Sequence, residues 1–232
     1  MKETVVITGA GSGLGESLAK QFSAVGHHVC LLGKTKAKLE QTAAFLKNDY
    51  SIYELDVTSS VSVENVMKEI WNERERIDCL VNNAGVGMFK YAEEINESEI
   101  NQMIDTNLKG TIYCTQRVLE GMKKKNKGLI VNIVSASGKY AKATESVYSA
   151  SKFGVRGFIE ALGMELAETN IQVFSAYMGN METNLWRNNL SADKQGNYME
   201  SDEVAEIIVE CLKPRKNLAV SDITIMNHIK QY

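Results

Sequence analysis

Short apolar runs alternate with longer amphipathic stretches along the chain. Seven runs rich in β-branched and other apolar residues are expected to form strands, at residues 5–8, 28–32, 52–55, 79–82, 129–134, 172–177 and 218–225. Between the first six, apolar residues recur every three or four positions, as in residues 14–25 and 100–112, which is the spacing of a helix with one buried face. The pattern therefore predicts strands and helices in regular alternation.

The expected strands are apolar at nearly every position rather than at every second one. Such strands are buried on both faces, because the helical crossovers between parallel strands cover the sheet on each side. The alternation continues through residues 1–232 without a repeat, a low-complexity tract or a linker, so we expect one doubly wound α/β domain. Residues 179–200 form the least regular stretch, and we interpret them as a lid over a site or as a plain surface loop.

Composition narrows the class of partner. The chain carries 26 basic and 29 acidic residues, a formal net charge of −3, with both signs interspersed. Neither nucleic acid nor an anionic membrane is therefore expected as a partner. The four cysteines lie far apart and form no CxxC pair, which predicts neither a metal site nor a disulfide framework and fits a reduced, cytoplasmic setting. No apolar segment approaches the ~18 residues that a membrane span requires.

A glycine cluster directly follows the first expected strand and opens the first expected helix. It reads Thr8-Gly9-Ala10-Gly11-Ser12-Gly13-Leu14-Gly15. Glycines allow a tight turn whose backbone N–H groups approach a pyrophosphate, and the helix N-terminus adds partial positive charge. The spacing fits TGxxxGxG better than the common GxGxxG fingerprint. Taken alone, the cluster is also consistent with an ordinary strand-to-helix turn.

Further motifs follow in order. Asn82-Asn83-Ala84-Gly85 comes after the fourth expected strand, Asn107 lies in the next helix, and Ser135 ends the fifth strand. Tyr148-Ser149-Ala150-Ser151-Lys152 opens the long helix after it. With the glycine cluster, these motifs cover almost the whole chain, which resembles the short-chain dehydrogenase/reductase family. The resemblance implies a single Rossmann-like domain whose seven-stranded parallel sheet has the order 3-2-1-4-5-6-7, and an oxidoreductase activity that uses a nicotinamide cofactor.

Tyr148 and Lys152 stand four residues apart at the start of a helix, so both lie on one face, about one turn apart. A free tyrosine has a pKa of about 10. A nearby lysine ammonium, together with the positive charge of an oxidised nicotinamide, is expected to lower the pKa of Tyr148 and to make it an acid/base catalyst near neutral pH. Each residue taken singly is also compatible with a structural role.

The family resemblance assigns the other catalytic roles. It implies that Ser135 donates a hydrogen bond to the substrate oxygen, that Lys152 also holds the ribose of the nicotinamide, and that Asn107 binds a water molecule for proton relay. The chemistry of the residues and the resemblance together predict the following cofactor-contacting residues: Gly9, Gly11, Ser12, Gly13, Leu14, Gly15, Gly33, Lys34, Thr35, Asp56, Val57, Asn83, Ala84, Gly85, Tyr148, Lys152, Gly179, Met181 and Thr183. No metal ligand is predicted.

The end of the second expected strand predicts the choice of cofactor. An acidic residue there would bind the adenosine ribose hydroxyls of NAD(H) and repel a 2′-phosphate. This chain has Gly33 at that position and Lys34 and Thr35 beside it, which together with Ser12 can receive a phosphate. We therefore expect NADP(H), with NAD(H) as the alternative. Lys34 could also belong to the solvated start of a helix, and Asp56, which matches the family's adenine-binding position, could be a loop cap.

The chain departs from the family pattern after the sixth strand, where Met178 replaces a proline before Gly179. Methionine lacks the fixed φ of proline, so we expect a less rigid and more adaptable pocket. By family position, the pocket is expected to be lined by Met88, Phe89, Tyr140, Tyr177, Met178 and Trp186. Few of these side chains are charged, which favours an uncharged ketone, aldehyde or diketone as substrate.

These observations predict an NADP(H)-dependent carbonyl reductase. A non-catalytic NADP(H)-binding regulator or scaffold is the alternative, although such a protein would not need Tyr148. Epimerase or dehydratase chemistry on a nucleotide sugar is less compatible with 232 residues, because relatives with that chemistry are generally longer. The resemblance also implies a homodimer or homotetramer, with residues 110–122 and 147–167 in the interface.

Overall fold

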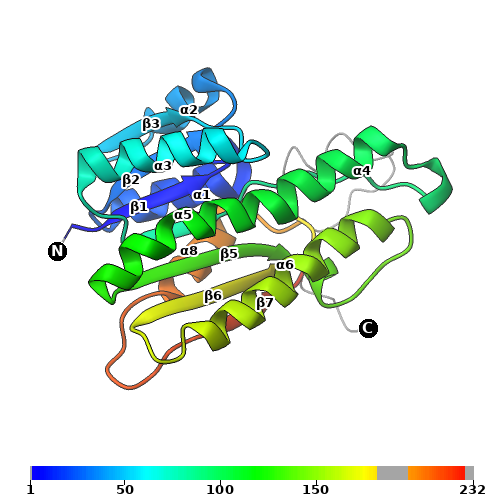
Figure 1. Ribbon diagram of the computed structural model, residues 1–232. Helices are drawn as coiled ribbons and strands as arrows, with labels where there is room; N and C mark the ends of the chain where they lie inside the picture. The colour runs from blue at the N-terminus through cyan, green and yellow to red at the C-terminus, as the bar shows by residue number, and fades with distance from the viewer. Residues whose placement is uncertain (1, 182–197, 228–232) are drawn as a thin grey trace.

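The computed structural model describes residues 2–181 and 198–227 (Figure 1). Seven parallel strands form one sheet in the order β3-β2-β1-β4-β5-β6-β7, which confirms the fold predicted from the sequence. The strands are β1 (Thr4–Thr8), β2 (His28–Gly33), β3 (Tyr50–Glu54), β4 (Cys79–Asn82), β5 (Gly128–Ser135), β6 (Ile171–Met178) and β7 (Asp222–Ile225). The α-helices described are α1 (Gly13–Ala24), α2 (Lys36–Ala43), α3 (Ser60–Arg74), α4 (Glu97–Met103), α5 (Gly110–Lys125), α6 (Ser146–Glu165) and α8 (Ser201–Cys211).

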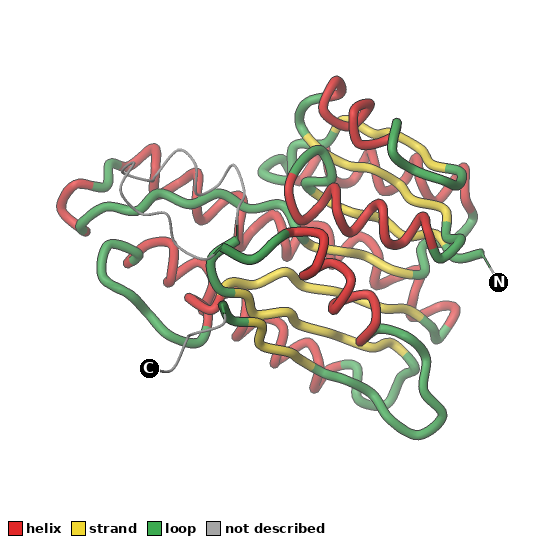
Figure 2. Tube along the Cα trace, turned by 180° about the vertical axis from the view of Figure 1, so that it is seen from behind, coloured by secondary structure: helices red, strands yellow, loops and turns green. Residues whose placement is uncertain are grey.

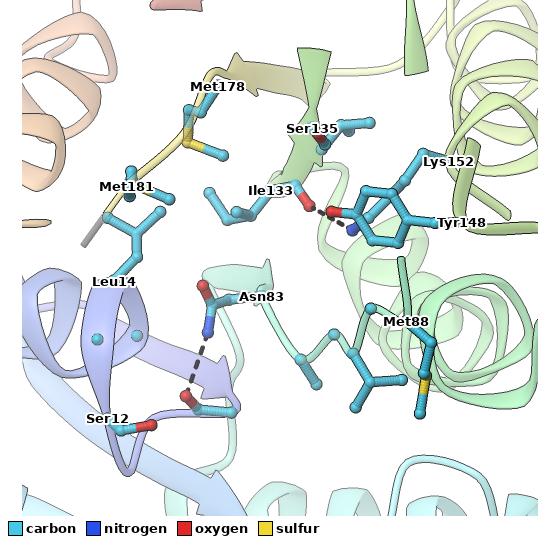
Figure 3. Close-up of a pocket in the computed structure, with 18 of the residues that line it drawn as sticks. Ser12, Leu14, Asn83, Met88, Ile133, Ser135, Tyr148, Lys152, Met178 and Met181 are labelled. Atoms are coloured by element: carbon cyan, nitrogen blue, oxygen red, sulfur yellow. Dashed lines mark hydrogen bonds between the residues drawn. The ribbon is translucent and has the colours of Figure 1, made fainter. Parts of the chain in front are cut away.

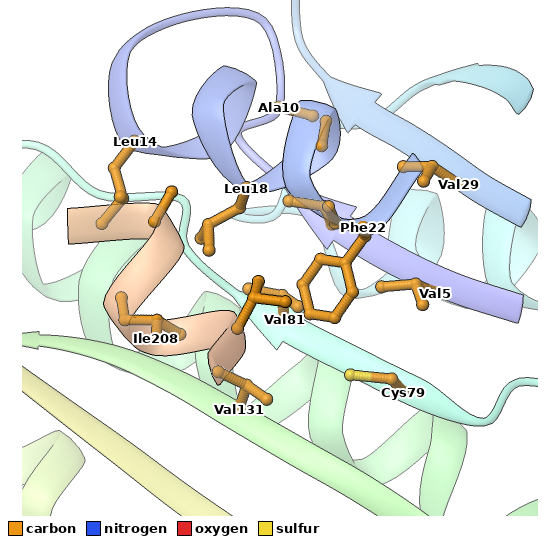
Figure 4. Packing of buried hydrophobic residues seen from close by; sticks show 14 of the residues in the cluster. Val5, Ala10, Leu14, Leu18, Phe22, Val29, Cys79, Val81, Val131 and Ile208 are labelled. Atoms are coloured by element: carbon orange, nitrogen blue, oxygen red, sulfur yellow. The ribbon is translucent and has the colours of Figure 1, made fainter. Parts of the chain in front are cut away.

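The two faces of the sheet are covered by different helices (Figures 1 and 2). On one face, Val5 and Ile7 of β1 join a hydrophobic cluster with α1, α2 and α8. Figure 4 shows Leu18 and Phe22 of α1 packed close to Ile208 of α8 in this cluster. On the other face, Val6 packs with α3, α5 and the end of α6. Successive residues of β1 are therefore all buried, which is why the strand reads as a continuous apolar run.

Most strand boundaries lie within two residues of those predicted, but the last strand is an exception. The prediction began it at residue 218, whereas β7 begins at Asp222. Leu218 is largely exposed and lies in the connection that follows α8. Its apolar side chain does not pack in the core, so hydrophobicity alone placed the start of this strand too early.

The periodicity of residues 100–112 predicted one regular α-helix, but the structure differs. α4 continues into a π-helical segment, Ile104–Lys109, before α5 begins at Gly110. A π-helical turn is wider than an α-helical turn and is often found at functional sites. Here it contains Asn107, whose side chain is almost fully buried. Figure 1 shows α4 and the first turns of α6 beyond the end of the sheet that lies away from the N-terminus.

None of the helices within residues 2–181 and 198–227 is both long and apolar enough to cross a membrane.

His28, at the start of β2, is buried and is expected to make stability depend on pH. Its Nε2 lies 3.1 Å from Ser51 Oγ, and its pKa is lowered by burial and by the charges of Arg74 and Lys2. The unfolded chain, in which the pKa of histidine is about 6.5, therefore takes up a proton before the folded chain does. The contribution of His28 to the free energy of unfolding should be fully present above about pH 6.5. It should decrease as the pH falls toward the lower pKa of His28 in the folded state.

Urea unfolding of the parent and of His28→Gln at pH 8 and pH 5.5 measures this contribution. Between pH 8 and pH 5.5, the free energy of unfolding should decrease more in the parent than in the variant. The effect of the carboxylates is the same in both proteins, so the difference between them reports on His28. An equal loss in the two proteins would contradict the assignment to His28.

Candidate active site

The carboxyl ends of β1, β4, β5 and β6 border a cavity of about 620 Å³ (Figure 3). In a parallel sheet, the carboxyl ends of neighbouring strands meet at one edge, which is where ligands of doubly wound folds bind. The structure places thirteen residues predicted for the site in its lining: Gly9, Ser12, Gly13, Leu14, Gly15, Asn83, Ala84, Gly85, Ser135, Tyr148, Lys152, Gly179 and Met181. Segments that are far apart in the sequence thus share one cavity.

The glycine turn has a backbone that requires glycine at two positions. Gly9 has φ +65°, a conformation that side chains with a Cβ rarely adopt. A Cβ on Gly15 would lie 2.2 Å from the carbonyl oxygen of Gly9 and 2.5 Å from Asn83 Nδ2. The first turn of α1 therefore packs directly against the preceding loop, and its N-terminus faces the cavity.

Thr8 links the glycine turn to the end of β4, a role that the sequence analysis missed. Its hydroxyl accepts hydrogen bonds from the backbone N–H groups of Asn83 (3.0 Å) and Ala84 (3.1 Å) and donates to the carbonyl of Val81 (3.3 Å). The side-chain amide of Asn83 donates in return to the carbonyls of Thr8 (3.0 Å) and Gly9 (3.2 Å). A threonine that ends a strand before a glycine turn is the only signal for this role in the sequence.

Three of the four predicted catalytic side chains, those of Ser135, Tyr148 and Lys152, come together on one side of the cavity. Tyr148 and Lys152 of α6 are 4% and 7% exposed, and Lys152 Nζ lies 5.7 Å from the centre of the Tyr148 ring. Lys152 Nζ also donates to the carbonyl of Ile133 over 3.5 Å. Ser135 ends β5, and Figure 3 shows its side chain beside Tyr148 and Lys152.

Burial has the largest effect on the pKa values of Tyr148 and Lys152 among the protein groups. Burial raises the pKa of Tyr148 to about 12, a hydrogen bond with Ser135 opposes this rise, and the charge of Glu145 adds to it. Burial also lowers the pKa of Lys152 to about 8. The expected lowering of the Tyr148 pKa requires an oxidised nicotinamide in addition to Lys152 and stays a prediction; among the protein groups alone, desolvation is the largest effect on both side chains. The raised pKa keeps the Tyr148 phenol protonated at neutral pH.

Comparison with known proteins identifies the family. The sequence profile described as short chain dehydrogenase matches residues 3–194. The chain belongs to the short-chain dehydrogenase family. A Staphylococcus epidermidis relative, named only as an uncharacterized oxidoreductase, is 30% identical over 226 residues, with 97% of both chains covered. A Staphylococcus aureus relative with the same description is 32% identical over 221 residues, covering 95% of each chain.

Solved structures of this family match the whole fold. An alcohol dehydrogenase from the archaeon Thermococcus sibiricus, in complex with 5-hydroxy-NADP, has a TM-score of 0.91 and 26% identity, covering 100% of this chain and 99% of that one. A serine dehydrogenase complexed with NADP+ has a TM-score of 0.89 and 28% identity, covering 95% and 93% of the two chains. Actinorhodin polyketide ketoreductase with NADPH has a TM-score of 0.87 and 28% identity, covering 97% and 95%.

In this short-chain dehydrogenase, Asn107 is buried and does not belong to the cavity lining. The side-chain amide of Asn107 donates to the carbonyl of Val86 (2.9 Å) and to Ser151 Oγ (3.0 Å), and its oxygen accepts from the N–H of Val86 (2.8 Å). The Asn107 side chain thus fixes the segment after Gly85, and both of its N–H groups are already used. The water-binding role that the resemblance implies stays a prediction.

Most of the residues predicted to bind the adenosine part of the cofactor do not line the cavity, in contrast to those predicted for the nicotinamide part. Lys34 forms an ion pair with Asp56 over 3.0 Å. Burial alone would raise the pKa of Asp56, but hydrogen bonds from Thr58 and Lys34 lower it below its ordinary value. Lys38, which the sequence analysis did not place in the site, lines the cavity with Ser12. Six predicted cofactor residues lie outside the cavity lining, so their roles stay predictions: Gly11, Gly33, Lys34, Thr35, Asp56 and Val57.

The predicted substrate pocket is only partly reproduced. Met88 and Met178 line the cavity, whereas Phe89 packs edge-on against the Tyr148 ring with 5.4 Å between ring centres. Tyr177 is buried beneath Lys139, whose Nζ lies 4.1 Å from its ring centre, and Tyr140 is 66% exposed. Neither tyrosine belongs to the cavity lining, because one packs against η3 (Ala136–Gly138) and α6 and the other points to solvent.

The predicted lid, residues 179–200, lies largely outside the described residues, as do Thr183 and Trp186. Its two described ends are joined, since Met181 and Met199 form a parallel bridge and the N–H of Met199 donates to the carbonyl of Asn180 over 3.1 Å. Met181 and Met199, on either side of the undescribed stretch, are therefore neighbours, and Met181 lines the cavity together with Met178.

Proposed function

We propose that this short-chain dehydrogenase is an NADP(H)-dependent carbonyl reductase that acts on a small uncharged ketone, aldehyde or diketone. The observation that carries the proposal is the shared lining of one cavity by the glycine turn and by Ser135, Tyr148 and Lys152. The glycine turn suits a dinucleotide phosphate, since its backbone approaches the cavity where no Cβ is present. Structural relatives in complex with NADP+ or NADPH support this assignment.

Each catalytic side chain has a role that follows from its position. A bound NADPH supplies the hydride for the carbonyl carbon. Tyr148 donates its phenolic proton to the carbonyl oxygen, for which its raised pKa keeps it protonated at neutral pH. Ser135 donates a hydrogen bond to the same oxygen as negative charge develops there. Lys152 stabilises the phenolate that remains on Tyr148.

Met88, Met178 and Met181 line this cavity. Flexible, polarizable methionine side chains adapt to substrates of different shape, and no carboxylate or guanidinium lines the cavity within the described residues. We therefore propose a substrate without charge and a pocket that tolerates several carbonyl compounds.

An NADPH-oxidation assay against a panel of aldehydes, ketones and diketones tests the function. Turnover of several uncharged carbonyl compounds is the expected result, and activity on a single compound would contradict the adaptable pocket. NADPH binding without any turnover across the panel would contradict the proposed reductase and favour a non-catalytic NADP(H)-binding regulator. Sedimentation velocity would test the proposed homo-oligomer.

The choice of NADP(H) is expected to depend on Lys34. Lys34→Glu removes a cation from the predicted 2′-phosphate site and places a carboxylate there, so the KM for NADPH should rise at least about tenfold while the KM for NADH stays unchanged or falls. Lys36→Glu, at the exposed first residue of α2, is the matched control. Equal effects of the two substitutions, or a lower KM for NADH than for NADPH in the parent, would contradict the preference.

A further inference from the structure

A buried carboxylate lies next to the catalytic residues and has no role in the mechanism described so far. Glu145 directly precedes α6, three residues before Tyr148, and is 6% exposed. Among the residues that the structure describes, no lysine, arginine or histidine forms an ion pair with it. A buried and unpaired carboxylate is costly, so its presence at this place calls for a physical reason.

The carboxylate is joined to Ser135 through a second serine. The hydroxyl of Ser135 donates to Ser137 Oγ over 3.2 Å, and the hydroxyl of Ser137 donates to Glu145. The backbone N–H of Ser137 also donates to Ser135 Oγ over 3.1 Å. An ionised carboxylate can only accept hydrogen bonds, so Glu145 fixes the direction of the Ser137 hydroxyl. Ser137 then holds Ser135 through two hydrogen bonds, one accepted from the Ser135 hydroxyl and one donated by the Ser137 backbone N–H, and the Ser135 hydrogen turns from Ser137 to the substrate oxygen when it donates there.

The same carboxylate acts on Tyr148 through its charge. A nearby negative charge disfavours the phenolate, and Glu145 raises the pKa of Tyr148 in addition to the effect of burial. Lys152, whose Nζ lies 5.7 Å from the Tyr148 ring centre, provides the opposing positive charge.

Charged groups on the other elements packed against α6 are engaged elsewhere. Asp105 pairs with Lys109 on the π-helical segment over 2.8 Å. Glu99 of α4 pairs with Lys90 over 2.6 Å, and Lys139 next to η3 pairs with Asp222 over 2.9 Å. β5 and β6 contain no acidic or basic side chain. Glu145 and Lys152 are thus the charged side chains that act most directly on Tyr148.

We propose that Glu145 is a positioning residue that orients the Ser137 hydroxyl and through it holds Ser135 in place beside Tyr148. Its effect on turnover rests on the proposed function, whereas its effect on the Tyr148 titration does not. The two effects can therefore be tested separately.

Fluorine NMR of protein labelled with 3-fluorotyrosine measures the Tyr148 titration directly and without substrate. The label makes the phenol more acidic and brings its titration into a pH range in which the fold can be monitored. The Tyr148 resonance is assigned by its loss in Tyr148→Phe. In Glu145→Gln, which keeps the size of the side chain and removes the charge, this resonance should titrate roughly one pH unit lower than in the parent.

Glu160→Gln is the matched control, because Glu160 lies on the same helix, is exposed and pairs with Arg156. Its Tyr148 titration should equal that of the parent. An unchanged titration in Glu145→Gln, or an equal shift in Glu160→Gln, would overturn the electrostatic role. If the parent turns over no carbonyl compound, the proposed function fails while this titration still decides the role of Glu145.

Ser137→Ala tests the positioning step and removes no charge, so it also serves if Glu145→Gln does not fold. In an active enzyme its kcat should fall about tenfold with an unchanged Kd for NADPH, because a misplaced Ser135 affects the transition state rather than cofactor binding. A double variant with Glu145→Gln should lose little more than the worse single variant, since both residues act through one chain of hydrogen bonds. A parent-like kcat in Ser137→Ala, or fully multiplied losses in the double variant, would overturn the step through Ser137.

Discussion

Replacing Tyr148 by phenylalanine is expected to lower kcat about a thousandfold or more while the Kd for NADPH stays within about twofold of the parent. The substitution removes only the hydroxyl that we propose delivers the proton to the carbonyl oxygen. The ring remains, and with it the edge-on contact with Phe89 and most of the packing in the cluster with Ile95 and Met103. Fluorescence titration of NADPH and the rate of NADPH oxidation measure the two quantities separately.

Tyr140→Phe is the control for this experiment, since Tyr140 is largely exposed and lies outside the cavity lining. This variant also loses a phenolic hydroxyl, but one that has no role in the proposed mechanism, so its kcat should match that of the parent. A Tyr148→Phe enzyme that keeps substantial turnover would contradict the role of Tyr148 as the general acid.

Replacing Gly15 by alanine is expected to abolish measurable cofactor binding, with a Kd for NADPH at least about a hundredfold higher, and to lower the melting temperature. A Cβ at this position would lie 2.2 Å from the Gly9 carbonyl oxygen, which belongs to the backbone and cannot move like the end of a side chain. The first turn of α1 must then separate from the glycine loop and from Asn83, which deforms the predicted pyrophosphate site.

Gly163→Ala is the matched substitution for Gly15→Ala. Gly163 lies in α6, and a Cβ there meets nothing within 4 Å. An alanine inside a helix is more favourable than a glycine by roughly 0.5–1 kcal/mol, so this variant should be slightly more stable and should bind NADPH normally. Calorimetry and NADPH titration of both variants check the pair, and normal NADPH affinity in Gly15→Ala would contradict the close packing of the turn.

The chemistry of the site is readable from the sequence where it depends on residue type at a local spacing. The glycine cluster and the pair Tyr148 and Lys152 are local motifs, and each sits where a strand or helix end brings it to the cavity. Thr8 and Glu145 were missed for the opposite reason. Their partners, Asn83 and Ser137, are identified only when the loops take up their positions, because no spacing along the chain indicates a hydrogen bond between such segments.

Predictions that depend on environment rather than residue type were less successful. Tyr177 and Tyr140 were expected to line the pocket, but one is buried beneath Lys139 and the other is exposed. The burial of the Tyr148 phenol, which raises its pKa among the protein groups alone, was likewise not part of the prediction. Both depend on how much solvent reaches a side chain, and a single sequence does not show this.

The sequence by itself determined the order of strands and helices, the doubly wound class of the sheet and the positions of the glycine turn and of Ser135, Tyr148 and Lys152. These depend on hydrophobic periodicity and on local motifs, which act over a few residues. Only the tertiary structure decided the π-helical segment around Asn107, the hydrogen bonds by which Thr8 links the glycine turn to the end of β4, and the burial that shifts the pKa values of Tyr148 and Lys152. These features arise from contacts between segments that are distant in the chain, and the free energy of burying a polar group depends on all of its neighbours at once.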